Sequence, residues 1–227
     1  MRKEQLTKFQ NQLDSAIIGY LGLLERKELL AVSIELSASL TKLEPKIQRS
    51  IVTIQDTLYA SLIVEAHAWL FDRSEKSSNL SLYRMLNLVA DTNFQPKHLL
   101  KHYIQPPKVV PLGANDSNWQ QKYKNTRENE FKEKLTECVL NINELISSKL
   151  AVRVKSIRDS MLAHKDGRYD VAGNGHTIQD VFCLLRLMKN ILVCLNSLFQ
   201  RVSYPIIETE KQARINAELF WERLTPT

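Results

Sequence analysis

Residues 181–202 read VFCLLRLMKNILVCLNSLFQRV and form the most apolar long stretch of the chain. Apolar residues recur in it every three or four positions, which places them on one face of an α-helix. This stripe consists of Val181, Leu184, Met188, Ile191, Leu195, Leu198 and Val202. Polar residues such as Arg186 and Lys189 interrupt the stretch, which disfavours a membrane-spanning helix. We therefore expect a core helix, begun by a capping box of Thr177 and Asp180, and no membrane segment.

The same spacing recurs along most of the chain. It predicts further helices over residues 4–43, 45–73, 77–91, 96–103, 120–165 and 209–224. The first two should lie antiparallel if their connection at Pro45 is short. A break is expected near Ser147 and Ser148, and the prolines of residues 105–118 predict an exposed loop. The sequence thus predicts an all-α fold, a bundle of five or more helices in one domain over residues 1–227.

Composition supports this fold class. The chain has 227 residues, enough to bury a substantial core. Hydrophobic residues make up 44% and charged residues 25%, values that fit a soluble globular protein and exclude the disordered and fibrous classes. Six glycines and seven prolines are too few for the many tight turns of an all-β protein.

The basic residues are unevenly distributed. The formal net charge is +6, and two stretches carry most of the excess. Residues 95–134 hold eight Lys or Arg against four Asp or Glu, and residues 147–168 hold six against two. Locally concentrated positive charge favours an anionic partner, for which RNA is the candidate.

The three cysteines give a prediction about the compartment. Cys138, Cys183 and Cys194 are an odd number without a close pair in sequence, and each lies in an apolar helical context. We expect buried, reduced thiols and a cytoplasmic location. The polar N-terminal residues also lack the apolar core of a secretory signal.

The second basic stretch contains the segment with the clearest chemistry, residues 157–166, which read IRDSMLAHKD. Neutral imidazole at His164 can accept the proton of a ribose 2′-hydroxyl, and the guanidinium of Arg158 can stabilise negative charge on a phosphate. Such a pair needs no metal, and the expected product is a 2′,3′-cyclic phosphate. An arginine and a histidine at this spacing are not specific by themselves, so the prediction depends on the whole segment.

This segment is similar to the signature of the HEPN superfamily, which consists of an arginine, a polar residue, a short apolar spacer and a histidine. Within the superfamily the chain resembles the abortive-infection U-type branch, in which an upstream segment like residues 70–82 also recurs. The resemblance covers about residues 20–200. It implies a helical bundle, a homodimer that brings two Arg/His motifs together, and a ribonuclease or toxin acting in phage defence, with an antitoxin or defence-system partner as a further expectation.

Helix geometry bears on how the motif works. Positions six apart on an ideal helix differ by roughly 240°, so Arg158 and His164 would not share a face of one straight helix. Either the helix ends or bends before His164, or a second copy completes the site across a two-fold axis. Which copy of His164 acts as base and which as acid stays open.

Neighbouring residues complete the predicted site. Asp159 is expected to orient Arg158 or His164, or to be a solvated helix residue. Lys155, Lys165 and Arg168 are expected to contact RNA phosphates, with a solvated basic face as the alternative. None of these residues is predicted to bind a metal ion.

The chain has other histidines outside this motif. His98 and His102 have the spacing of two metal ligands, but no third ligand stands at a recognisable distance, so we expect neither metal nor cofactor. His67, between Glu65 and Trp69, is expected to pack at the edge of the core.

The sequence therefore predicts a metal-independent endoribonuclease. Its substrate is RNA, and tRNA is one candidate. The alternative is a catalytically inactive HEPN module that binds RNA or a partner protein.

Overall fold

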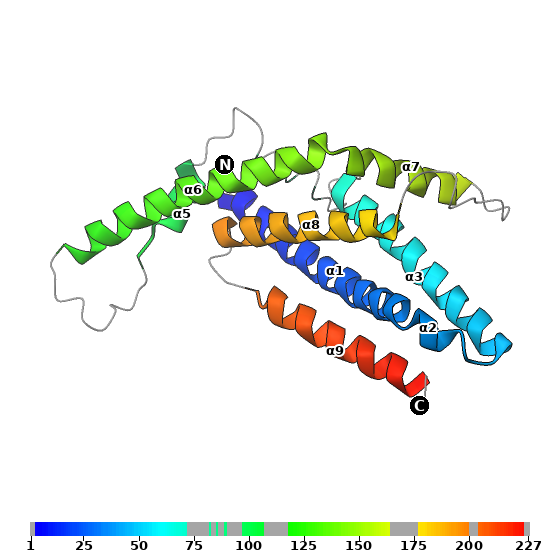
Figure 1. The fold of residues 1–227 in the computed structure, drawn as a ribbon. Helices are drawn as coiled ribbons and strands as arrows, with labels where there is room; N and C mark the ends of the chain where they lie inside the picture. Colours follow the sequence, from blue (N-terminus) through cyan, green and yellow to red (C-terminus); the bar gives the residue numbers. More distant parts are fainter. Residues whose placement is uncertain are drawn as a thin grey trace.

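The computed structural model describes residues 3–71, 82, 85, 89, 97–106, 118–163, 177–199 and 204–224. The described secondary structure is helical, as predicted, and contains no strand (Figure 1). The helices are α1 (Lys3–Glu35), α2 (Ser37–Leu40), α3 (Pro45–Phe71), α5 (Lys97–Tyr103), α6 (Trp119–Ser147), α7 (Lys149–Ala163), α8 (Ile178–Phe199) and α9 (Ile206–Leu224).

Helix α8 lies at the centre of the bundle. Its buried residues include the predicted stripe from Val181 to Leu198 and also Leu185, Leu192 and Cys194, so more than one face is covered. Val202, the last residue of that stripe, lies outside the described residues. Helices α1, α3, α5, α6 and α7 all pack against it. Its N-terminus has the predicted capping contact, in which the backbone N–H of Thr177 donates to Asp180 Oδ2 at 2.9 Å. Core burial therefore accounts for the apolar character of this segment.

By length and composition alone, α8 could also cross a membrane, because its most apolar 18-residue window has a mean hydropathy of 1.6. In the folded chain 56% of that window is buried inside the protein. A core helix of this kind meets the same hydropathy test as a membrane span.

Helices α1 and α3 run antiparallel, which confirms the prediction made from the short connection at Pro45. Arg26 pairs with Glu65 in a two-pronged contact, whose Nη2–Oε2 distance is 2.7 Å. Farther along, Gln55 Nε2 donates to Ser33 Oγ at 3.1 Å. Arg26 comes before Ser33 in α1, whereas its partner Glu65 comes after Gln55 in α3. This reversed order is what an antiparallel pair requires.

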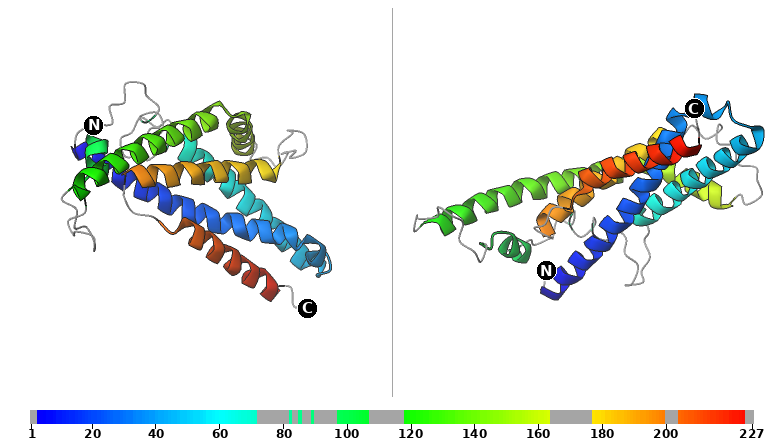
Figure 2. Two further views of the ribbon diagram at one scale, coloured as in Figure 1. Left: turned by 60° about the vertical axis from the view of Figure 1, so that its left-hand side comes forward. Right: turned by 90° about the horizontal axis from the view of Figure 1, so that it is seen from below.

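Helix α9 lies along α1 in the same direction, and Figures 1 and 2 show the two side by side. Lys27 lies 3.8 Å from Glu210, and Trp221 Nε1 donates to the Leu29 carbonyl at 2.8 Å. Trp221 is fully buried and anchors a second, smaller apolar cluster. The C-terminal helix thus stabilises the far end of the α1–α3 pair.

The predicted break at Ser147 and Ser148 separates α6 from α7. The Ser148 hydroxyl donates to the Leu145 carbonyl at 2.8 Å and accepts from the Ala151 N–H at 3.2 Å. One side chain therefore caps the end of α6 and the start of α7. The N-terminal part of α6 extends beyond the other helices, with α5 packed against it (Figures 1 and 2).

Several element boundaries differ from the prediction. The first helix is interrupted at Leu36, so residues 37–40 form the separate short helix α2. The last helix begins at Ile206 rather than near Thr209, because the Thr209 N–H already donates to the Pro205 carbonyl. Residues 107–117 of the predicted loop lie outside the described residues. Of the predicted third helix the structure describes three residues, all helical and buried: Leu82, Met85 and Val89.

All three cysteines are free thiols, but they differ in environment. Cys138 and Cys194 are buried, as predicted, and they contact each other between α6 and α8. The hydrogen bond with Cys194, together with burial, raises the pKa of the Cys138 thiol. The prediction of full burial is wrong for Cys183, which is half-buried.

Two glycines of α1 provide a test of the α1–α3 packing. A Cβ at Gly19 would overlap the Trp69 ring, whereas a Cβ at Gly22 would meet nothing closer than Arg26 Nη2 at 3.7 Å. We expect Gly19→Ala to destabilise the protein by about 1–3 kcal/mol through overpacking. Gly22→Ala is the matched control and should stabilise it by roughly 0.5–1 kcal/mol through helix propensity. Urea unfolding curves measure both, and equal stability of the two variants would contradict the close approach at Gly19.

Candidate functional site

The site is built on α7, which packs against α3 and α8. Val154 and Ile157 are buried on its inner face. Arg153 forms an ion pair with Asp180 at 2.6 Å and so links the outer face of α7 to the start of α8. Since Arg158 follows the buried Ile157, its side chain leaves the helix at the margin of the packed face, next to α3.

Among the described residues Arg158 has two partners, which approach its guanidinium group from different helices. Nη1 lies 2.7 Å from His67 Nδ1 on α3. Nε lies 2.9 Å from Asp159 Oδ1, and Nη2 contacts the same carboxylate oxygen. The Arg158 side chain is 27% exposed, so part of it is still accessible to solvent. The structure thus presents a cation that is held in place at the protein surface.

Asp159 contacts Arg158, and its side chain is also exposed to solvent. Its hydrogen bond to Arg158 lowers the pKa of the carboxyl group, and the positive charges of Arg158 and Lys155 act in the same direction. The carboxylate is therefore ionised at neutral pH and neutralises part of the guanidinium charge. The exposed location of Asp159 means that solvent screens this pair.

The other predicted residues divide into two groups. Lys155 lies on the exposed side of α7, one turn before Asp159, and so shares its surface. His164, Lys165 and Arg168 lie outside the described residues. The structure therefore brings together Arg158, Asp159 and Lys155, and the position of His164 relative to them stays a prediction.

His67 is the residue that sequence reasoning assigned to a packing role alone. It is buried, 3% exposed, and its ring also packs on Phe71 with centroids 5.1 Å apart. The available signal was its place among Ile63, Ala66 and Leu70, which form the buried face of α3. A histidine on such a face needs a polar partner. Nothing in the sequence identified that partner as Arg158, 91 positions away.

No three His, Cys, Asp or Glu residues among those that the structure describes lie close enough to hold a metal ion. His102 lies on α5 at the other end of the molecule from α7 (Figure 1). Among the residues that the structure describes, Arg158 and Lys155 supply the positive charge at the candidate site.

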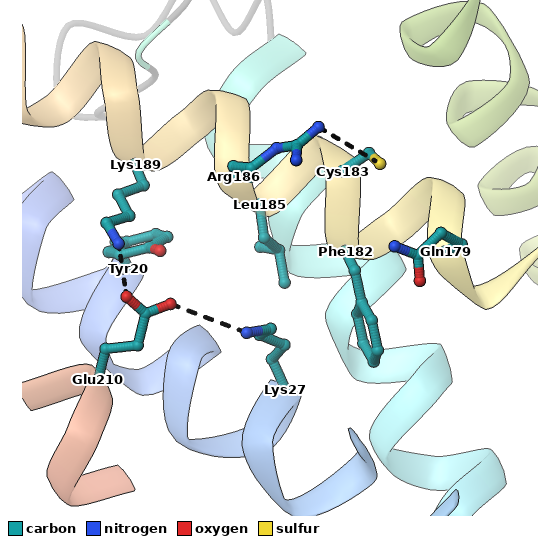
Figure 3. A pocket seen from close by; sticks show the side chains of 9 residues that line it. All are labelled: Tyr20, Lys27, Gln179, Phe182, Cys183, Leu185, Arg186, Lys189 and Glu210. Carbon is teal, nitrogen blue, oxygen red and sulfur yellow. Dashed lines mark hydrogen bonds and ion pairs between the residues drawn. The ribbon is translucent and has the colours of Figure 1, made fainter. Parts of the chain in front are cut away.

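A cavity of about 280 Å³ lies apart from the candidate site, between α1, α8 and α9 (Figure 3). Lys27 and Lys189 both point to Glu210 in it, and the Lys189–Glu210 distance is 2.5 Å. Arg186 turns towards the Cys183 thiol at its upper edge. Because Glu210 of α9 pairs with Lys27 of α1 and with Lys189 of α8, the contacts in this cavity join three helices.

The Asp159–Arg158 contact predicts a shifted titration. Because the folded-state pKa is lowered, the contribution of this pair to stability is present above the ordinary pKa and is lost as the pH falls through the folded value. In a carboxyl-detected NMR titration we expect the Asp159 midpoint below its ordinary value of 3.8. Arg158→Gln should return the midpoint towards that value. An unchanged midpoint in the variant would show that Arg158 is not the cause.

Comparison with known proteins agrees with the helical architecture. The family model described as AbiU2, a HEPN family, matches residues 16–220. No curated protein and no solved structure matches the chain. This HEPN family has a ribonuclease-like or RNA-binding role in abortive infection. Matched over most of its length, the chain belongs to the AbiU2 family of HEPN proteins.

Proposed function

We propose that the protein is a metal-independent endoribonuclease of abortive infection, with Arg158 and His164 as its catalytic residues and Asp159 as an orienting residue. The observation that carries the proposal is the Arg158 guanidinium, which is held by contacts from two helices while the side chain is still 27% exposed. A prepositioned cation of this kind is suited to stabilise charge that develops on a phosphate. The proposed setting is the cytoplasm.

The proposed reaction uses the substrate's own nucleophile. The ribose 2′-oxygen attacks the adjacent phosphorus while its proton passes to an imidazole acting as general base. The bond between phosphorus and the 5′-oxygen breaks, and a general acid protonates that leaving oxygen. A 2′,3′-cyclic phosphate and a free 5′-hydroxyl result, with no water consumed. Arg158 stabilises the extra negative charge on the phosphoryl oxygens in the transition state.

Base and acid are two roles, and the motif of one chain supplies one histidine. A second copy of the protein in a two-fold dimer supplies the other His164, so that the site is composite. Lys155, Lys165 and Arg168 hold the RNA backbone on either side. Contacts of this type bind phosphates without reading the base sequence, so the choice of RNA, tRNA included, depends on other features.

A non-catalytic function is the second candidate, and one observation favours it. Asp159 already accepts two hydrogen bonds from Arg158, which reduces the charge that the guanidinium offers to a phosphate. In this reading the same surface binds RNA, or an antitoxin or defence-system protein, without cleavage.

The cleavage assay separates these functions. Purified protein is incubated with tRNA or total RNA in EDTA, and the ends of the products are identified. We expect 2′,3′-cyclic phosphate ends with the wild type, and a loss of at least about 100-fold in rate for both His164→Ala and Arg158→Ala.

Arg49→Ala is the matched control for Arg158→Ala. It removes the same charge from an exposed position near the start of α3, whereas His67, which contacts Arg158, lies near the end of that helix. The variant should cleave like the wild type. Equal cleavage by His164→Ala and the wild type, with fold and melting temperature unchanged, would exclude the proposed mechanism. RNA binding without cleavage by the wild type would favour the second candidate.

The composite site predicts an oligomeric state. At micromolar concentration, sedimentation or light scattering should give the mass of two chains, since both histidines are needed in one site. A mass of 26.2 kDa at these concentrations, the mass of one chain, together with full cleavage activity, would contradict the shared site.

A further inference from the structure

The contact between α3 and α7 assigns a role to His67 that its burial alone does not explain. His67 is 3% exposed, while the side chain of Arg158, which it contacts, is 27% exposed. The pair therefore spans the boundary between the core and the candidate site. A substrate can reach Arg158 from solvent, but it cannot reach His67.

The chemistry of the two groups fixes which atom donates. Arginine has five N–H donors and no acceptor, so in the 2.7 Å contact Nη1 must donate and His67 Nδ1 must accept. An accepting Nδ1 carries no proton. His67 is therefore the neutral tautomer with its proton on Nε2, which is the form that a buried position beside a cation favours.

The contacts also determine what Arg158 has left to offer. Asp159 engages Nε–H and one N–H of Nη2, and His67 engages one N–H of Nη1. Since each terminal nitrogen has two hydrogens, one N–H on each Nη has no partner in the part of the chain that the structure describes and can bind an anionic oxygen. Two partners at different edges of a planar group also restrict its rotation, so that these two donors keep one direction.

We infer that His67 is a positioning residue of this site: it accepts a hydrogen bond from Arg158 and holds the guanidinium in the orientation that presents two N–H groups to a phosphate. The inference rests on the proposed function for its effect on catalysis, but the contact itself can be tested without any activity. Small errors in the placement of such a group are known to reduce rates strongly.

Two substitutions separate positioning from packing. His67→Asn keeps an acceptor near the place of Nδ1, because the asparagine side-chain oxygen occupies a similar position. His67→Leu fills much of the same buried volume without an acceptor. We expect kcat for RNA cleavage to fall on the order of 10- to 100-fold in His67→Leu and to stay within about threefold of the wild type in His67→Asn.

The values of kcat are compared only if the melting temperature of each variant is close to that of the wild type. Retained cleavage in a folded His67→Leu would overturn the inference, and so would an equal loss in both variants. An effect confined to KM would assign His67 to RNA binding and not to positioning in the transition state, and would equally overturn it.

An NMR measurement on the wild-type protein tests the contact if a variant does not fold or if no RNA is cleaved. A long-range proton–nitrogen spectrum of the imidazole rings distinguishes the tautomers, and His67→Asn assigns the signal. We expect an unprotonated Nδ1 and a protonated Nε2 for His67. A protonated Nδ1 would overturn the inference whatever the activity, whereas an absence of cleavage with the expected tautomer would reject the proposed function alone.

Discussion

Burial of α8 on several faces is the constraint on which the rest of the structure depends. A helix with buried residues around more than one stripe needs neighbours on more than one side, and only the face with Arg186, Asn190 and Val193 stays exposed in α8. Helices α1, α3, α5, α6 and α7 provide that cover. The ion pairs and capping contacts described above then fix the direction and register of helices that the apolar surface has already brought together.

This arrangement explains why the candidate site lies where it does. Helix α7 contributes buried Val154 and Ile157 to the core, and so its position relative to α3 is set by packing. The next residue along the chain, Arg158, cannot enter the core as an unpaired charge. Its contact with His67 satisfies the buried side and its contact with Asp159 the exposed side. The cation of the candidate site is thus held by the same interface that stabilises the fold.

The fold was largely predictable because helix spacing and punctuation are local properties. The apolar stripe of α8, the turn at Pro45 and the break at Ser148 all follow from a few neighbouring residues. The interruption at Leu36 was not predicted, since neither glycine nor proline marks it.

For the candidate site, the motif identified Arg158 and Asp159 because they lie next to each other in sequence. The pairing of His67 with Arg158, and of Cys138 with Cys194, depends on which helix faces meet in three dimensions. A single sequence contains no local signal for such contacts. His67 could be recognised only as a polar residue on an apolar face, with its partner unknown.

Ser148 caps both the end of α6 and the start of α7, so the rotation of α7 about its own axis does not depend on that of α6. In one continuous helix, each inserted or deleted residue would rotate everything after it by about 100°. Because α7 starts anew at Ser148, its rotation is set by its own packing on α3 and α8. The projecting part of α6 can therefore change in length between related chains while Arg158 keeps facing α3, so that the bundle has one segment open to variation and one whose register is fixed.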